Sequence, residues 1–104
     1  MAPPLYLEFE HILRKIYKAD LENITHLVKS VNNNVVKALI EIAYNILKGD
    51  IPISPKQIIK LKKDKAFLHL LISRTVPVKK KRDILEKNQS LIKNMLAVLF
   101  RSVK

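Results

Sequence analysis

The sequence contains no cysteine and only one glycine, and both shortages exclude classes of functional site. Without cysteine, the chain has no disulfide framework, no thiolate zinc site and no thiol nucleophile. A single glycine, Gly49, is too few for a glycine-rich phosphate loop or a dinucleotide-binding fingerprint. The same shortage argues against tight β-hairpins, and no segment alternates strongly enough between apolar and polar residues to predict a strand.

Long apolar runs are also missing. The longest uncharged stretches of the second half, 66–73 and 94–100, are far shorter than the ~20 residues of a membrane-spanning helix. The first residues carry Glu8 and Glu10 rather than a basic segment followed by an apolar one, so we expect no signal peptide. With 104 residues, of which 48% are hydrophobic and 28% charged, the chain fits one intracellular globular domain, 1–104, without integral membrane association.

Residues able to carry catalysis are sparse. His11, His26 and His69 are scattered along the chain and do not form a spaced pair that would bind a metal. Neither paired carboxylates nor a serine with a recognisable base partner is present. We therefore expect no enzymatic activity, no metal and no cofactor.

Acidic residues are scarce in the second half, where the net charge of +11 is concentrated. Residues 1–50 contain six basic and six acidic residues, whereas residues 51–104 contain fourteen basic and three acidic ones. Such segregation indicates a neutral packing half joined to a basic half that meets a polyanion, and nucleic acid is the commonest partner of this type.

Apolar residues recur at helical spacing, which predicts an all-α domain, a compact bundle of about six or seven short helices. We expect Pro3-Pro4 to start the first helix and Asp20 to cap the second. The segment 35–48 should be the central helix, because only a narrow stripe interrupts its apolar circumference, formed by Lys37, Glu41, Asn45 and Lys48. Gly49 follows it as the residue that ends the helix.

In the basic half, Ser54-Pro55-Lys56-Gln57 has the pattern of a capping box and predicts a helix with Ile58, Ile59 and Leu61 facing inward. Asp64 should cap a further helical stretch, and whether the two form one bent helix stays open. A basic segment, 79–87, follows Val76-Pro77-Val78. The last predicted helix, Gln89–Ser102, has one apolar face, formed by Leu91, Ile92, Met95, Leu96, Leu99 and Val103.

The spacing of Lys56, Lys60 and Lys63 places them on one helix face, and no carboxylate interrupts this run before Asp64. Lysines are flexible point charges that contact phosphates without reading bases, so the pattern favours sequence-independent binding over a merely solvated exterior. The predicted nucleic-acid-binding residues are Lys56, Lys60, Lys62, Lys63, Arg74, Lys79, Lys80, Lys81 and Arg82.

Aromatic residues are few in the basic half, where only Phe67 and Phe100 occur, and we expect Phe67 in the core. Single-strand binding usually needs aromatic stacking platforms among the basic residues. The composition therefore favours a duplex over a single strand, and we expect DNA rather than RNA as the partner.

The run Lys79-Lys80-Lys81-Arg82 has the composition of a nuclear-localisation signal, which would make an importin-type carrier a partner. Such recognition needs an extended, accessible segment. A folded helix over 79–87 with Ile84 and Leu85 buried would weaken this interpretation.

Two other functions fit the composition. The chain could be an oligomeric helical assembly module whose basic face meets an acidic protein, or a protein that lies on anionic membrane surfaces. The segments 35–48 and 89–102 have more apolar surface than a small monomer readily covers, so we expect a homodimer.

The segment 38–85 also resembles a small basic protein of animal Polinton/Maverick-type (adintovirus-like) DNA elements. The shared features are an apolar helix ending in Asn-Ile-Leu-Lys-Gly, the Ser-Pro-Lys-Gln sequence, a lysine-rich helix, and a Lys-Lys-Lys run followed by Ile-Leu. The resemblance implies a DNA-associated or virion-core protein located in the nucleus or the virion. After Lys87 the chain departs from this pattern, because relatives continue with glycines and an apolar tail.

Overall fold

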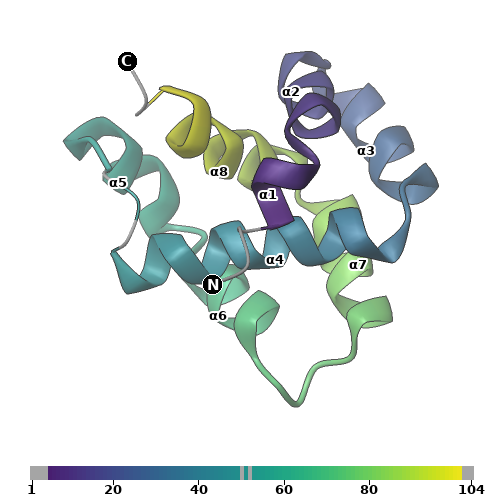
Figure 1. Cartoon of the computed structure of the whole chain (residues 1–104). Helices are drawn as coiled ribbons and strands as arrows, with labels where there is room; N and C mark the ends of the chain where they lie inside the picture. Colours follow the sequence, from purple (N-terminus) through teal and green to yellow (C-terminus); the bar gives the residue numbers. More distant parts are fainter. Residues whose placement is uncertain (1–4, 50, 52, 102–104) are drawn as a thin grey trace.

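The computed structural model describes residues 5–49, 51 and 53–101, and these residues form eight α-helices and no β-strand (Figure 1). The prediction of an all-α fold is confirmed, with one helix more than expected. The expected helix start at Pro3-Pro4, and Ser102 and Val103 at the expected end, lie outside the described residues. In chain order the helices are α1 (Leu5–Glu8), α2 (Glu10–Lys18), α3 (Leu21–Ser30), α4 (Asn33–Lys48), α5 (Pro55–Lys62), α6 (Lys65–Ile72), α7 (Val78–Lys87) and α8 (Gln89–Arg101).

The additional helix results from a break at Phe9, whose φ of −105° and ψ of 23° interrupt the first predicted helix. The backbone hydrogen bonds continue across the break, because Phe9 N donates to Leu5 O at 3.2 Å and Leu13 N donates to Phe9 O at 3.0 Å. The Tyr6 N–H donates to Glu41 Oε1 at 3.2 Å. The polar stripe of α4 thus supplies an acceptor for the first turn of α1, whose N–H groups have no partner within the helix.

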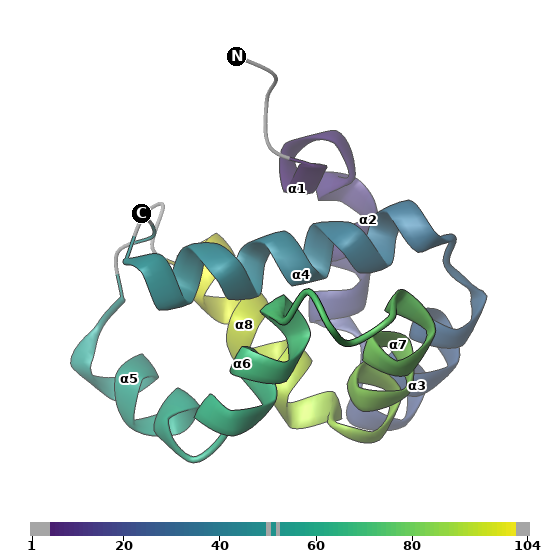
Figure 2. The same ribbon diagram turned by 90° about the horizontal axis from the view of Figure 1, so that it is seen from below.

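Helix α4 is the centre of the core, as predicted. It crosses the molecule with α1 on one side and α6 and α7 on the other (Figures 1 and 2). Helix α8 also packs against it. The buried residues of α4 are Val35, Val36, Ala38, Leu39, Ile42, Ala43 and Ile46.

Polar residues at the ends of α3 and α4 explain where these helices begin and end. Asp20 Oδ1 accepts from Asn23 N at 2.9 Å, which confirms the predicted cap of α3. Asn32 Oδ1 accepts from Asn34 N at 2.9 Å and Val35 N at 3.2 Å, so α4 begins two residues before the predicted Val35. Gly49 ends α4 with a φ of 82°, a backbone conformation that glycine adopts without steric cost.

The apolar faces of α4 and α8 are covered within one chain. In α8, the buried residues include Leu91, Ile92, Met95, Leu96 and Val98. These side chains and those of α4 belong to a single hydrophobic cluster. The apolar residues from which we expected a homodimer are therefore covered within one chain, and the homodimer stays a prediction.

The lysine-rich segment forms two helices, α5 and α6, rather than one bent helix. Leu61 is buried as predicted, but the inward orientation expected for Ile58 and Ile59 is wrong, because these side chains are 51% and 72% exposed. Residues two positions apart lie on nearly opposite sides of a helix, so Ile59 cannot share the buried side of Leu61. Asp64 takes the predicted N-cap position of α6, but its side chain makes no capping hydrogen bond, and its Oδ2 atom is buried without a hydrogen-bond partner among the described residues.

Candidate nucleic-acid interface

Helix α5 and the residue that follows it, Lys63, present three lysines to solvent on one face. Lys56, Lys60 and Lys63 are all exposed, and their spacing of four and three residues places them on the same side of the helix. We call these three residues the α5 lysine face. Lys62 is also exposed but lies on another side of the helix.

The position of α5 is fixed by its first turn. Gln57 N donates to Ser54 Oγ at 3.3 Å and Ser54 N donates to Gln57 Oε1 at 3.0 Å, which is the predicted capping box. The same Gln57 side chain donates through Nε2 to the carbonyl of Ala97 at 3.1 Å and so joins α5 to α8. This anchoring, together with buried Leu61, keeps the α5 lysine face directed away from the core.

No carboxylate of the described residues forms an ion pair with the α5 lysine face. The one salt bridge among the described residues joins Arg14 Nε to Glu10 Oε2 at 3.2 Å, within α2. Asp64 follows the lysines in sequence but forms no ion pair among the described residues, and one of its oxygens is buried. Among the described residues, the lysines of α5 therefore face solvent without an ion-pair partner.

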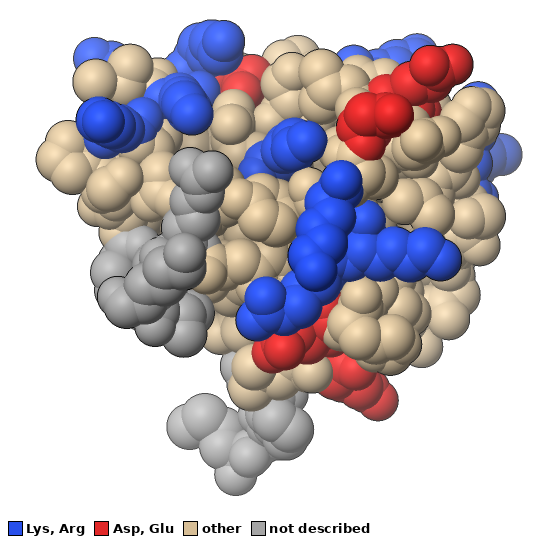
Figure 3. Space-filling view, turned by 90° about the horizontal axis from the view of Figure 1, so that it is seen from above, with Lys and Arg blue, Asp and Glu red and all other residues tan. Residues whose placement is uncertain are grey.

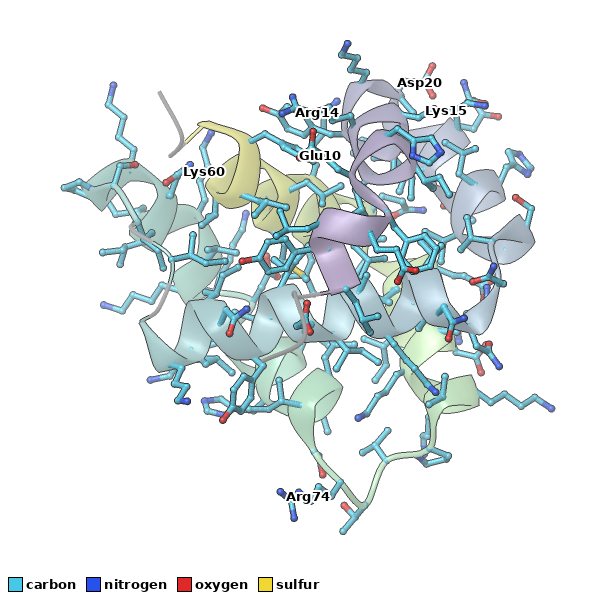
Figure 4. All side chains as sticks on the ribbon, viewed as in Figure 1. Glu10, Arg14, Lys15, Asp20, Lys60 and Arg74 are labelled. Carbon is cyan, nitrogen blue, oxygen red and sulfur yellow. The ribbon has the colours of Figure 1, made fainter. Side chains whose placement is uncertain are left out.

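Arg74, in the segment between α6 and α7, and Lys79 and Lys80, in the first turn of α7, are also exposed, and we refer to these three residues as the α7 cluster. Helices α5 and α7 lie at opposite ends of α4 in both ribbon views (Figures 1 and 2). Figure 4 likewise shows Lys60 and Arg74 on different sides of the molecule. The nine residues predicted as one binding surface are thus divided, because α6 and the length of α4 separate the two groups.

The other half of the basic run in α7 points inward. Lys81 is only 8% exposed, and half-buried Arg82 donates to the carbonyl of Val28 and, at 2.8 Å, to Asn33 Oδ1. These two predicted binding residues contribute to packing between α7 and its neighbours. The segment is helical and Leu85 is fully buried, so Lys79–Arg82 is not the extended, accessible segment that a carrier of the importin type needs.

Basic residues also gather in the neutral half, where the sequence predicted no site. Lys15 and Lys18 line a shallow groove of about 670 Å³ between α2 and α3, together with Ala19, Asn23, His26, Leu27 and Ser30. Their three-residue spacing in the sequence would have indicated this pair. We did not predict this pair, because residues 1–50 contain equal numbers of basic and acidic residues. Figure 3 shows Lys and Arg on this side of the molecule in separate groups rather than in one continuous patch.

The two phenylalanines of the basic half make contacts away from the α5 lysine face. Phe67 packs against the core, as predicted. The Phe100 ring lies 5.6 Å from the Tyr17 ring, and the guanidinium of Arg14 lies 4.4 Å above Phe100. Neither phenylalanine stands as a free platform beside the α5 lysine face.

Other kinds of site are not evident in the described part of the chain. His11, His26 and His69 are all exposed and lie on three different helices. No three His, Asp or Glu side chains within the described ranges come together in a group that could hold a metal ion. None of the helices described is both long and apolar enough to cross a bilayer.

Comparisons with protein-family models, with curated proteins and with solved structures find no match to this chain. The resemblance to proteins of Polinton/Maverick-type elements therefore stays a prediction.

Proposed function

We propose that the protein binds nucleic acid, preferably duplex DNA, through contacts between lysines and backbone phosphates that do not depend on base sequence. The observation that carries this proposal is the α5 lysine face, an exposed row on a firmly anchored helix with which no carboxylate of the described residues pairs. Free positive charges on a rigid support attract a polyanion and release its counterions on binding.

The type of residue supports contact with phosphates rather than with bases. The α5 lysine face contains no arginine, the residue whose forked guanidinium most often recognises guanine. Of the two arginines predicted as ligands, Arg82 is engaged by Val28 and Asn33. The proposed role is therefore binding without base reading.

The engaged positions of Phe67 and Phe100 favour a duplex over a single strand. Proteins that hold single strands combine basic grooves with aromatic side chains on which bases stack. Here one phenylalanine packs against the core and the other is covered by Tyr17 and Arg14. A protein with these properties suits a DNA-coating or DNA-packing role in a nucleus or a virion, as the sequence resemblance also implies.

Fluorescence anisotropy with labelled DNA tests this proposal. Several unrelated duplexes of equal length should bind within a few-fold of one another, and single strands of the same length should bind more weakly. The variant Lys60→Gln/Lys63→Gln should weaken binding to all duplexes equally, because phosphate contacts carry no base information. A strong preference for one duplex, or unchanged affinity in this variant, would contradict the proposal.

A further inference from the structure

An apolar groove lies on the side of α5 away from the α5 lysine face. It has a volume of about 350 Å³ and lies between the end of α4, the segment leading to α5, and helices α5 and α6. Among the described residues, its apolar lining consists of Ile46, Leu47, Ile53, Ile58, Leu61 and Leu68, and its charged lining consists of Lys62 and Lys65. We call this feature the α5 groove.

Phosphate binding does not account for this groove. Ile58 and Lys62 are four residues apart and so share one side of α5, whereas Lys56, Lys60 and Lys63 share another. Ile58 lines the groove and remains 51% exposed, and an aliphatic side chain gains nothing from facing a phosphate backbone. The two sides of α5 therefore present different chemistry.

We infer that the α5 groove binds an acidic amphipathic helix of a partner protein. An amphipathic helix places apolar side chains at i, i+3, i+4 and i+7 into such a groove. Lys62 and Lys65 supply positive charge beside the apolar lining, and none of the described residues that line the groove carries a carboxylate, so the complementary helix carries Asp or Glu next to its apolar anchors. This site is independent of the proposed DNA contacts.

Other occupants fit the groove less well. A bilayer surface receives apolar side chains that protrude, whereas Leu61 and Leu68 in this lining are buried at 5% and 2% exposure. A second copy would need a free apolar stripe. The exposed large apolar residues of the described chain do not provide one, because no two of them are three or four positions apart: Leu7, Leu21, Tyr44, Ile58, Ile59 and Leu70.

A pair of synthetic peptides tests the inference on the full-length chain. One peptide has Leu at i, i+3, i+4 and i+7 with Glu at the remaining positions. The other has the same composition with Leu at alternate positions, so that its charge is identical but no helical apolar stripe forms. In anisotropy titrations, the patterned peptide should bind at least ten-fold more tightly than its control. Equal binding of the two peptides would overturn the inference, because charge alone would then explain the association.

Substitutions in α5 locate the contact. Ile58→Ser should weaken binding of the patterned peptide about ten-fold or more, as expected for an apolar side chain that becomes buried. Ile59→Ser is the matched control, because Ile59 is more exposed yet does not line the groove. The affinity of the Ile59→Ser variant for the patterned peptide should stay within two-fold of wild type. Lys62→Glu should weaken peptide binding most strongly at low salt. Equal losses in the Ile58→Ser and Ile59→Ser variants would overturn the inference.

Further measurements separate this inference from the proposed function and from other occupants. Ile58→Ser should leave duplex DNA affinity unchanged, whereas Lys60→Gln/Lys63→Gln should lower DNA affinity and keep the preference for the patterned peptide. Light scattering and flotation with phosphatidylserine vesicles complete the test. If Ile58→Ser abolishes self-association or vesicle binding while the patterned peptide does not bind, the occupant is a second copy or a lipid surface and the inference is wrong.

Discussion

The guanidinium of Arg82 donates a hydrogen bond to the backbone carbonyl of Val28, in the last turn of α3. A carbonyl near the end of a helix has no acceptor role left within the helix, and a positive charge at that end is favourable. The second guanidinium nitrogen donates a hydrogen bond to Asn33 Oδ1 at the start of α4. Arg82, which we predicted to bind phosphate because it follows three lysines, thus connects α7 to α3 and α4.

Replacing Arg82 should therefore affect stability. Arg82→Ala should lower the free energy of unfolding by about 1.5–3 kcal/mol, the range for hydrogen bonds to charged groups. Arg74→Ala is the control, because Arg74 is exposed in the segment between α6 and α7. Urea titrations should show a lower midpoint for the first variant alone, and equal midpoints would contradict a structural role for Arg82.

The central position of α4 gives a second prediction. Leu39→Ala or Ile42→Ala should each cost roughly 2–5 kcal/mol, because both side chains are fully buried and a cavity remains after truncation. Lys37→Ala, on the exposed side of the same helix, should change stability little. Unfolding midpoints that do not shift in the two core variants would show that α4 is not central.

Gln57 allows the capping box to be separated from the contact with α8. Ser54→Ala removes only the side-chain cap, at a cost of about 0.5–2 kcal/mol. Gln57→Ala keeps this cap but removes the reciprocal bond to the Ser54 N–H and also the bond to the carbonyl of Ala97, so it should cost ~1 kcal/mol more than Ser54→Ala. Thermal unfolding of both variants measures the difference, and equal destabilisation would mean that the Ala97 contact contributes nothing.

Local patterns in the sequence predicted the helices well, because caps and helical periodicity act within a few residues. Asp20, Asn32, Gly49 and Ser54 each mark a helix end through a bond or a backbone angle that involves only near neighbours. The placement of α1 was not predictable in this way, because the acceptor for the Tyr6 N–H is Glu41, thirty-five residues further along the chain.

The candidate site was less predictable because it depends on tertiary arrangement. The spacing of Lys56, Lys60 and Lys63 correctly indicated a shared exposed face. A run such as Lys79–Arg82 gives no such information, since adjacent residues of a helix point in different directions. Two of its four side chains packed inward, and α5 and α7 folded to opposite ends of α4.

The separation of the two basic groups predicts that one molecule can hold two duplexes. DNA attached to beads and coated with the protein should capture a second, labelled duplex. Lys79→Gln/Lys80→Gln should abolish this capture while leaving binding to the first duplex largely intact, because the α5 lysine face is unaffected. Undiminished capture by that variant would show that the α7 cluster does not take part.

The central claim, that the α5 lysine face binds phosphates, is tested most directly by the salt dependence of duplex binding. Each neutralised phosphate contributes about −0.9 to the slope of log K against log salt. Lys60→Gln/Lys63→Gln should therefore flatten the slope by about 1.8, since two such contacts are lost. The matched variant Lys15→Gln/Lys37→Gln removes the same charge from exposed positions outside α5 and α7 and should leave the slope nearly unchanged. Equal flattening in both variants, or none in the first, would contradict the account.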